Sequence, residues 1–176
     1  MPPVRLARPD DLDKLAEIER SAASVFRDVG LAWVADGETM NRHVLEAACR
    51  DGTLWVAADS GGEPVGFLAA HALDGRLYIA EVSVARSHQR QGIGGALVAA
   101  AVGHARRSGF PAVTLTTYRD LSWNGPFYAR LGFEEVDPDG TLPGHMRKVR
   151  AEAGHDPSRR CLMVMSLDGE GDRPDA

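Results

Sequence analysis

The sequence predicts an α/β (α+β) fold in which helices flank one mixed sheet, and the first half of that sheet is largely antiparallel. Three observations lead to this prediction. Apolar strand patterns at 53–58, 65–73 and 76–84 are separated by tight Gly- and Asp-containing turns, as in an antiparallel meander. A glycine-rich segment at 89–97 then leads into an alanine-rich helical pattern. Beyond this helix, strand and helix patterns alternate as far as residue 167.

The elements of the first half follow from apolar spacing and turn residues. The regular stretches, in chain order, are a strand at 4–6 closed by Pro9, a helix capped by Asp10 or Asp11, and a helix from Thr39 to Ala48 stopped by Asp51-Gly52. Residues 21–38 between the two helices are less regular. The strands 53–58, 65–73 and 76–84 complete this half.

The second half alternates between the two kinds of element. Its predicted segments are a helix ending near Ser108 with Gly109 as its C-cap, a strand at 112–117, a short helix from Asn124 and Pro126 to Gly132, and strands at 133–136 and 161–167. Residues 137–160 hold Pro, Gly, His and mixed charges and are interpreted as a long excursion. We expect one domain over residues 1–167 and a disordered tail over 168–176.

Composition excludes several classes of protein. The 176 residues are 44% apolar and 26% charged, which is typical of a globular domain. A net charge of −5 argues against a nucleic-acid partner. The chain has neither an apolar run long enough to span a membrane nor the apolar core of a signal peptide, so we expect a cytoplasmic protein without a membrane partner.

The cysteines point to a reducing compartment. Cys49 and Cys161 lie far apart, with no Cys-x-x-Cys motif or Cys/His cluster nearby. We interpret them as buried thiols, and we expect neither a disulfide nor a metal site.

Residues 89–97 read Gln-Arg-Gln-Gly-Ile-Gly-Gly-Ala-Leu and are the most informative segment. Glycines at the start of a helix bring unpaired amides and the positive end of the helix dipole to one point, which suits a phosphate or pyrophosphate. A dinucleotide fingerprint needs a third small residue where Leu97 stands, and a triphosphate-binding loop needs a Gly-Lys-Ser/Thr triplet that the chain lacks. A glycine-rich turn without a ligand is the remaining alternative.

The segment resembles the acetyl-CoA pyrophosphate loop of the GNAT family of N-acetyltransferases, whose pattern Gln/Arg-x-x-Gly-x-Gly/Ala is met by Gln89, Gly92 and Gly94. A second family pattern, Phe-Tyr-x-x-Leu-Gly-Phe, follows at the expected distance. It is matched by Phe127, Tyr128, Leu131, Gly132 and Phe133. Both motifs stand in the family's order, and the resemblance spans about residues 3–167.

The resemblance implies the GNAT fold, with about seven strands and with the fourth and fifth strands splayed around the pantetheine arm of the cofactor. It implies direct transfer of an acetyl group from acetyl-CoA, the co-substrate, to a primary amine, without a metal. It assigns pantetheine binding to the backbone of Val82, Ser83 and Val84. Pyrophosphate binding falls to Gln89, Arg90, Gln91, Gly92, Ile93, Gly94 and Gly95. Many relatives carry an asparagine where Leu121 stands here, so Asn124 is either a cofactor ligand or an N-cap.

Transfer of an acetyl group to an amine needs a base for the amine and an acid for the departing thiolate. The resemblance makes Tyr128 the acid; the alternative is a core aromatic residue. Glu81 is the candidate base because strand alternation places it with Ser83, opposite Val82 and Val84. Its alternative is a salt-bridged strand residue, and His71 is the second candidate base. The fifth strand offers threonines instead of a base: Thr114, Thr116 and Thr117.

The acceptor pocket is expected from residues 21–38, the hairpin around Gly75 and the excursion 137–160. An aromatic, acidic site for an amine could combine Phe26, Trp33, Asp36, Glu38 and Trp123, although packing alone could account for each of them. Arg119 could contact the adenosine phosphate or face solvent. The leading hypothesis is an N-acetyltransferase, a type of acyltransferase, that acts on a small primary amine. A protein lysine or N-terminal acetyltransferase and a non-catalytic acyl-CoA-binding regulatory module are the alternatives, and a homodimer is left open.

Overall fold

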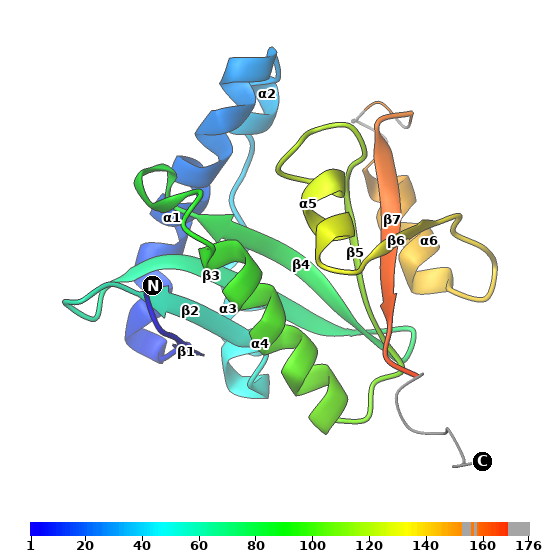
Figure 1. The fold of residues 1–176 in the computed structure, drawn as a ribbon, viewed down its shortest axis with the longest axis horizontal. Coiled ribbons are helices and arrows are strands. Elements are labelled where there is room, and N and C mark those ends of the chain that lie inside the picture. The colour runs from blue at the N-terminus through cyan, green and yellow to red at the C-terminus, as the bar shows by residue number, and fades with distance from the viewer. Residues whose placement is uncertain (153–155, 157, 169–176) are drawn as a thin grey trace. The chain divides into compact units, whose positions relative to one another are not determined.

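The computed structural model describes residues 1–152, 156 and 158–168 (Figure 1). Its strands form one mixed sheet of seven strands in the order β1-β2-β3-β4-β5-β7-β6, flanked by helices, which confirms the predicted fold class. By its internal contacts the chain divides into two compact units. The first comprises 1–70 and 81–102, and the second comprises 71–80 and 103–176. The prediction of one domain over 1–167 stays a prediction, and the predicted tail, apart from Asp168, lies outside the described residues.

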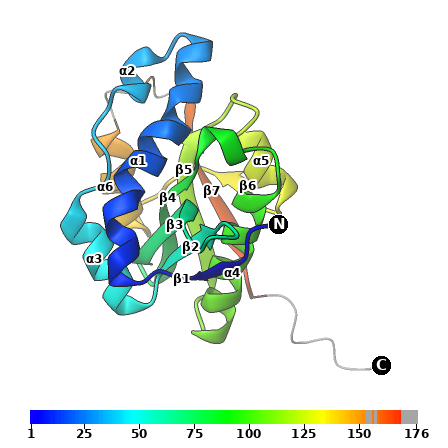
Figure 2. The same ribbon diagram turned by 90° about the vertical axis from the view of Figure 1, so that its left-hand side faces the viewer.

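The first unit joins antiparallel strands to two long helices. β1 (Val4–Leu6) pairs antiparallel with β2 (Leu54–Ala58). β2 pairs antiparallel with β3 (Pro64–Leu73), as predicted. α1 (Leu12–Ala23) and α3 (Arg42–Asp51) cover one face of these strands (Figure 2). Their apolar stripes share one core with the strands, formed by Leu12, Leu15, Ile18, Leu45, Ala48, Leu54, Val56, Phe67 and Ala69. This core holds the strands that precede the glycine loop.

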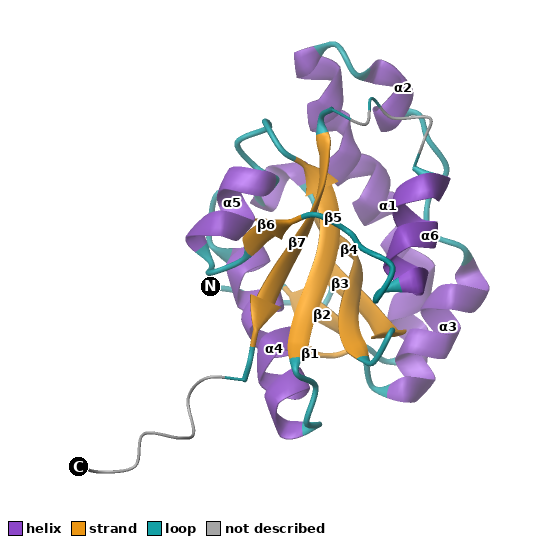
Figure 3. Cartoon of the chain, turned by 90° about the vertical axis from the view of Figure 1, so that its right-hand side faces the viewer, coloured by secondary structure: helices purple, strands orange, loops and turns teal. Residues whose placement is uncertain are grey.

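The second unit begins at His71, with the last residues of β3 and the hairpin turn that follows them. The first residues of β4 (Arg76–Val84) pair in parallel with β5 (Ala112–Tyr118) through Leu77 with Val113 and Tyr78 with Thr114. β7 (Arg160–Ser166) pairs antiparallel with both β5 and β6 (Glu134–Val136). α5 (Gly125–Arg130) and α6 (Pro143–Ala151) lie on opposite faces of these strands (Figure 3). α4 (Ile93–Arg107) connects the two units.

Two stretches are more regular than the sequence predicted. Residues 21–38 contain the end of α1, a 3-10 helix η2 (Ser24–Val29) and α2 (Ala32–Ala35). The excursion 137–160 contains α6, which has no side-chain cap from its own N-terminal residues. Its first amides are instead bound by Asp74, 70 residues earlier in the chain. A cap from so far away leaves no local signal, and for this reason the pattern of the sequence did not reveal the helix.

The start of α3 also differs from the prediction. The helix begins at Arg42, and its cap is Asn41, whose Oδ1 accepts a hydrogen bond of 2.8 Å from the amide of His43. Thr39 lies before the cap. Asparagine in an extended conformation is a favoured N-cap residue. Asn41 therefore caps the helix, two residues after the expected start at Thr39. None of the described helices has both the length and the apolar character that crossing a bilayer requires.

Candidate functional site

The glycine loop joins the end of β4 to the start of α4. A 3-10 turn, η3 (Arg86–His88), follows β4, and α4 begins at Ile93. Its first helical hydrogen bond runs from the Ala96 amide to the Gly92 carbonyl, at 3.1 Å. The preceding amides of α4 therefore lack a helical partner and point out of the helix at its positive end. This is the arrangement that binds phosphate groups.

The backbone of the loop bends sharply. Gly92 has φ +81° and Arg90 has φ +61°, both in the left-handed region. Glycine adopts this conformation without strain, whereas Arg90 does so at a cost. Arg90, Gln91 and Gly92 are exposed, and Ile93 is buried. The exposed part of the loop is thus backbone and long polar side chains, and Ile93 serves as the apolar anchor beneath it.

Three contacts within the first unit hold the loop in place. The Gln89 side-chain amide donates to the Val84 carbonyl at 3.0 Å, and the Ala85 amide donates to the Val65 carbonyl at 2.9 Å. A Cβ atom at Gly66 would lie 3.1 Å from the Ser83 carbonyl oxygen, so this glycine allows β3 to approach the end of β4 closely. Gln89 therefore binds the carbonyl of Val84, one of the residues whose backbone the resemblance assigns to pantetheine binding. This bond helps to position the loop.

Glu81 and Ser83 project from the same face of β4, as strand alternation predicts. The Ser83 hydroxyl donates to Glu81 Oε1 at 2.7 Å, and Ser83 is buried. The bond fixes the orientation of the carboxylate on the strand. Whether this carboxylate accepts a proton during the reaction stays a prediction.

Tyr128 is a buried residue of α5, in the second unit. Its ring makes edge-on contacts with Phe127 and Phe133, with centroids 5.0 and 5.8 Å apart. The start of α5 is packed closely, since a Cβ atom at Gly125 would lie 2.7 Å from the Arg119 carbonyl oxygen. The motif therefore forms an aromatic cluster that holds the phenol ring rigidly.

Asn124 stands at the N-cap position of α5 but makes no capping hydrogen bond through its side chain. Its Oδ1 is buried and has no hydrogen-bond partner among the described residues. A buried acceptor without a donor is uncommon in folded proteins. Asn124 therefore makes no N-cap hydrogen bond through its side chain. Its orphaned oxygen suits a hydrogen-bond donor on a bound molecule.

The residues expected to bind the acceptor amine have other partners or are exposed. Asp36 forms an ion pair with Arg27, which balances its charge. Trp33 is 52% exposed, and Glu38 is also exposed. Trp123 belongs to the second unit, whereas the other four belong to the first. Arg119, expected at a phosphate or in solvent, forms an ion pair of 2.7 Å with Glu135.

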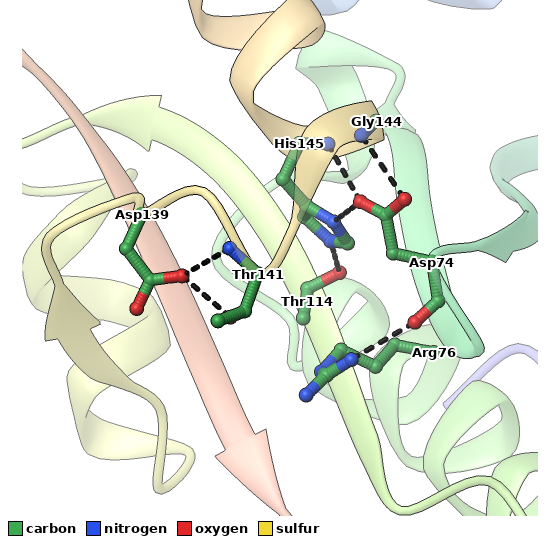
Figure 4. Close-up of polar contacts among 7 residues, drawn as sticks. All are labelled: Asp74, Arg76, Thr114, Asp139, Thr141, Gly144 and His145. Carbon is green, nitrogen blue, oxygen red and sulfur yellow. Dashed lines mark hydrogen bonds and ion pairs between the residues drawn. The ribbon is translucent and has the colours of Figure 1, made fainter.

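A polar cluster that the sequence did not reveal joins the β3–β4 turn to α6 (Figure 4). Asp74 Oδ1 accepts from the Gly144 amide at 3.0 Å, and Asp74 Oδ2 accepts from the His145 amide at 2.9 Å. The His145 ring is fully buried; its Nδ1 lies 2.7 Å from Asp74 Oδ2 and its Nε2 lies 2.7 Å from the Thr114 hydroxyl. With Nδ1–H donating to the carboxylate, Nε2 accepts from Thr114. The turn around Gly75 and the start of α6 therefore meet, and the acceptor pocket stays a prediction.

The hydrogen bonds to Asp74 stabilise its charged form. The His145 side chain contributes most, and the amides of His145 and Gly144 add to it, so the pKa of Asp74 falls from 3.8 to about 2. The side chain of Asp74 is 13% exposed. The β3–β4 turn itself requires φ +49° at this residue, a conformation that aspartate tolerates better than most residues.

A second polar network holds the other end of α6. The Thr116 hydroxyl donates to Glu152 Oε1 at 2.6 Å, and Arg160 forms an ion pair with Glu152 at 3.1 Å. The Tyr78 hydroxyl lies 3.1 Å from the Thr116 hydroxyl. His71, the second candidate base, lies beside the Tyr78 ring at a centroid distance of 5.4 Å. Burial is the largest cause that lowers the pKa of His71, and the nearby charge of Lys148 adds to it, so His71 is neutral near pH 7.

Cys161 is buried and Cys49 is partly buried, and both are free thiols. Burial raises the pKa of Cys161 to about 11, which keeps it protonated and unreactive. Within the described residues, no group of three or more His, Cys, Asp or Glu side chains is placed to hold a metal ion.

The Asp74 carboxylate predicts a dependence of stability on acid. Because its pKa in the folded protein lies below the ordinary value, it stabilises the fold fully above about pH 4 and loses this effect as the pH falls towards 2. Asp74→Asn should lower the melting temperature at pH 7. The asparagine side chain would place its NH2 group against groups of α6 that themselves donate hydrogen bonds. The variant should also lose less stability than wild type when the pH is lowered from 4 to 2. Melting curves across this range measure both effects, with the exposed Asp137→Asn as the matched control. Equal curves for Asp74→Asn and wild type would contradict the assignment.

Comparison with known proteins places these features in a family. A family model described as the acetyltransferase (GNAT) family matches residues 13–133, which include the glycine loop and the aromatic cluster of α5. The PaiA N-acetyltransferase of Thermoplasma acidophilum, solved with coenzyme A, superposes with a TM-score of 0.70 at 16% identity, over 95% of this chain and 99% of that one.

Two further solved structures share the fold. The ribosomal-protein-S18-alanine N-acetyltransferase of Escherichia coli gives a TM-score of 0.67 at 14% identity and covers all of both chains. The N-acetylglutamate synthase of Neisseria gonorrhoeae, solved with coenzyme A and N-acetyl-glutamate, gives 0.70 at 21% identity, over 96% of this chain and 36% of that one. Identities this low show the fold, whereas the family match covers more than half of the sequence. The chain therefore belongs to the GNAT acetyltransferase family.

Proposed function

We propose that the protein is an acetyl-CoA-dependent N-acetyltransferase that moves the acetyl group directly onto a primary amine of a small molecule. The observation that carries this proposal is the glycine loop, where unpaired amides at the start of α4 follow β4 after one 3-10 turn and a sharply bent backbone. Membership of the GNAT family and the coenzyme A bound to solved relatives support acetyl-CoA as the co-substrate.

Each residue in the proposed mechanism has one role. The amides of residues 90–95 bind the pyrophosphate, the backbone of Val82, Ser83 and Val84 binds the pantetheine arm, and Asn124 accepts a hydrogen bond from the cofactor through its orphaned Oδ1. Glu81 takes a proton from the ammonium form of the acceptor, directly or through water. The amine nitrogen then attacks the thioester carbonyl and the C–N bond forms. The nitrogen, now positively charged, releases its second proton to solvent, and the C–S bond breaks. Tyr128 gives its proton to the departing thiolate.

The acceptor could be a small molecule or a protein, because solved relatives of similar fold include both an N-acetylglutamate synthase and an N-acetyltransferase of a ribosomal protein. Release of free thiol from acetyl-CoA, measured across a panel of small amines and of peptides with free N-termini or lysines, tests the proposal. Turnover with small amines supports it, and turnover with peptides alone makes the protein acetyltransferase the correct assignment. Coenzyme A binding without turnover of any amine would indicate a regulatory module.

Cofactor binding should depend on the glycine loop. Gly94→Glu would place a side chain and a negative charge where the pyrophosphate is expected, so binding of acetyl-CoA should be lost. Isothermal titration calorimetry measures the affinity. Ala99→Glu adds the same charge to an exposed position of the same helix and should bind normally. Equal affinities for the Gly94→Glu variant and wild type would remove the loop from the cofactor site.

Turnover should depend on the phenol of Tyr128. Tyr128→Phe keeps the ring within the aromatic cluster and removes the proton donor, so kcat should fall by roughly 10²-fold or more, as expected for the loss of a general acid. Affinity for acetyl-CoA should stay close to wild type. An unchanged kcat, under conditions where the chemical step limits the rate, would assign Tyr128 to packing.

The pH dependence of the rate tests Glu81. Glu81→Gln can still accept the Ser83 hydrogen bond but cannot accept a proton. The variant should lose most of its activity near neutral pH and recover part of it at high pH, where free amine becomes abundant. A pH–rate profile parallel to that of wild type, accompanied by a lower melting temperature, would show that Glu81 is structural and would favour His71 or bulk water as the proton acceptor.

A further inference from the structure

α6 is anchored at both ends by polar contacts on one side of the helix. His145 near its start and Glu152 just after its end are spaced so that they share a face with Lys148. The polar atoms of the two outer residues are satisfied, since His145 binds Asp74 and Thr114, and Glu152 binds Thr116 and Arg160. The helix is thus held against the sheet on both sides of Lys148.

Lys148 is a charged side chain on this face of the helix, and it is partly buried, whereas Arg147 and Arg150 are exposed. Its Nζ lies 5.6 Å from the centroid of the Tyr78 ring, and its charge is one of the causes that lower the pKa of His71. Among the residues that the structure describes, Lys148 forms no ion pair, although its neighbours His145 and Arg160 each have a carboxylate partner. The ammonium therefore points towards Tyr78 and His71 without an anion to balance it.

The groups around this ammonium favour an anionic ligand over a further protein contact. A partly buried cation over the face of an aromatic ring is stabilised only weakly compared with one that binds a carboxylate. The carboxylate of Glu152 is already shared between Thr116 and Arg160. The neutral His71 ring adds no opposing charge. Arg147 and Arg150 on the exposed side of the same helix make the local potential more positive.

Resting on the proposed acetyltransferase function, we propose that Lys148 binds the carboxylate of the acceptor. The acceptor is then an amino-acid-like molecule that carries both a primary amine and a carboxylate. Lys148 lies in the excursion 137–160 and Tyr78 lies on the strand that follows the Gly75 hairpin, and both segments are expected to contribute to the acceptor pocket. The helix ends, fixed by Asp74 and Glu152, make Lys148 a specificity-determining residue that needs little rearrangement on binding.

The test compares N-acetyl-L-amino acids with their own carboxamides, bound to the coenzyme A-loaded protein and measured by calorimetry. This readout does not need turnover. Wild type should prefer at least one carboxylate over its amide by roughly 10-fold or more, the factor expected for a hydrogen bond to a charged group. Lys148→Met, which keeps the length of the side chain, should abolish this preference and leave amide binding unchanged. Lys148→Arg should restore most of it.

Two controls separate the proposal from its alternatives. Arg147→Met removes the same charge from an exposed position of α6 and should keep the preference for the carboxylate. Affinity for coenzyme A alone should be equal in wild type and Lys148→Met; a drop would show that Lys148 binds a phosphate of the cofactor and would overturn the proposal. A melting temperature close to wild type shows that the variant folds.

The outcomes also separate this inference from the proposed function. If amines are acetylated but carboxylate and amide forms are bound equally, the Lys148 proposal is wrong and the acetyltransferase proposal stands. If N-acetyl-amino acids bind through Lys148 but no thiol is released with any amine, the anion site is supported and the catalytic proposal fails. A preference for the carboxylate that survives Lys148→Met would place the anion site elsewhere and overturn the inference.

Discussion

The arrangement of the second unit depends on the carboxylate of Asp74. It lies in a turn that requires a left-handed backbone, and it accepts bonds from two amides at the start of α6 and from the ring of His145. These bonds satisfy helix amides that would otherwise need water, and they orient an imidazole that is fully buried. His145 in turn reaches Thr114 in the middle of β5. One carboxylate thus links a turn, a helix and a strand that are distant in sequence, and the position of Lys148 follows from that link.

The two units contribute different chemistry. In the first, unpaired backbone amides and glycines gather at the start of α4, an arrangement suited to phosphate groups, and side chains such as Gln89 hold the loop in place. In the second, side chains predominate: the aromatic cluster around Tyr128, the orphaned oxygen of Asn124, and the polar networks at both ends of α6. Recognition by backbone groups suits a ligand that stays the same while side chains change. Side-chain recognition suits an acceptor that differs between members, because side chains can change without altering the fold.

Local signals in the sequence were sufficient for much of the fold. Alternation and tight turns located β4 at its observed bounds and the neighbouring strands within one or two residues, because each of these strands is defined by its own residues. The glycine loop and the Tyr128 motif were recognisable for the same reason. α6 was not, because its cap is Asp74 and its own residues are polar. The sequence also did not predict the partners of Asp36 and Arg119 or the unbalanced charge of Lys148. Each of these depends on which side chains meet after folding.

In the proposed reaction, the carbonyl carbon of the acetyl group leaves sulfur and becomes bonded to nitrogen. The most direct measurement follows that carbon by 13C NMR, with acetyl-CoA labelled at the carbonyl, wild-type protein and a panel of amino acids. The thioester signal should decay while an amide carbonyl signal grows in equal amount, and omitting the amine should stop both changes. Growth of free acetate or of an ester signal in place of the amide, or a thioester that persists with every amine, would contradict it.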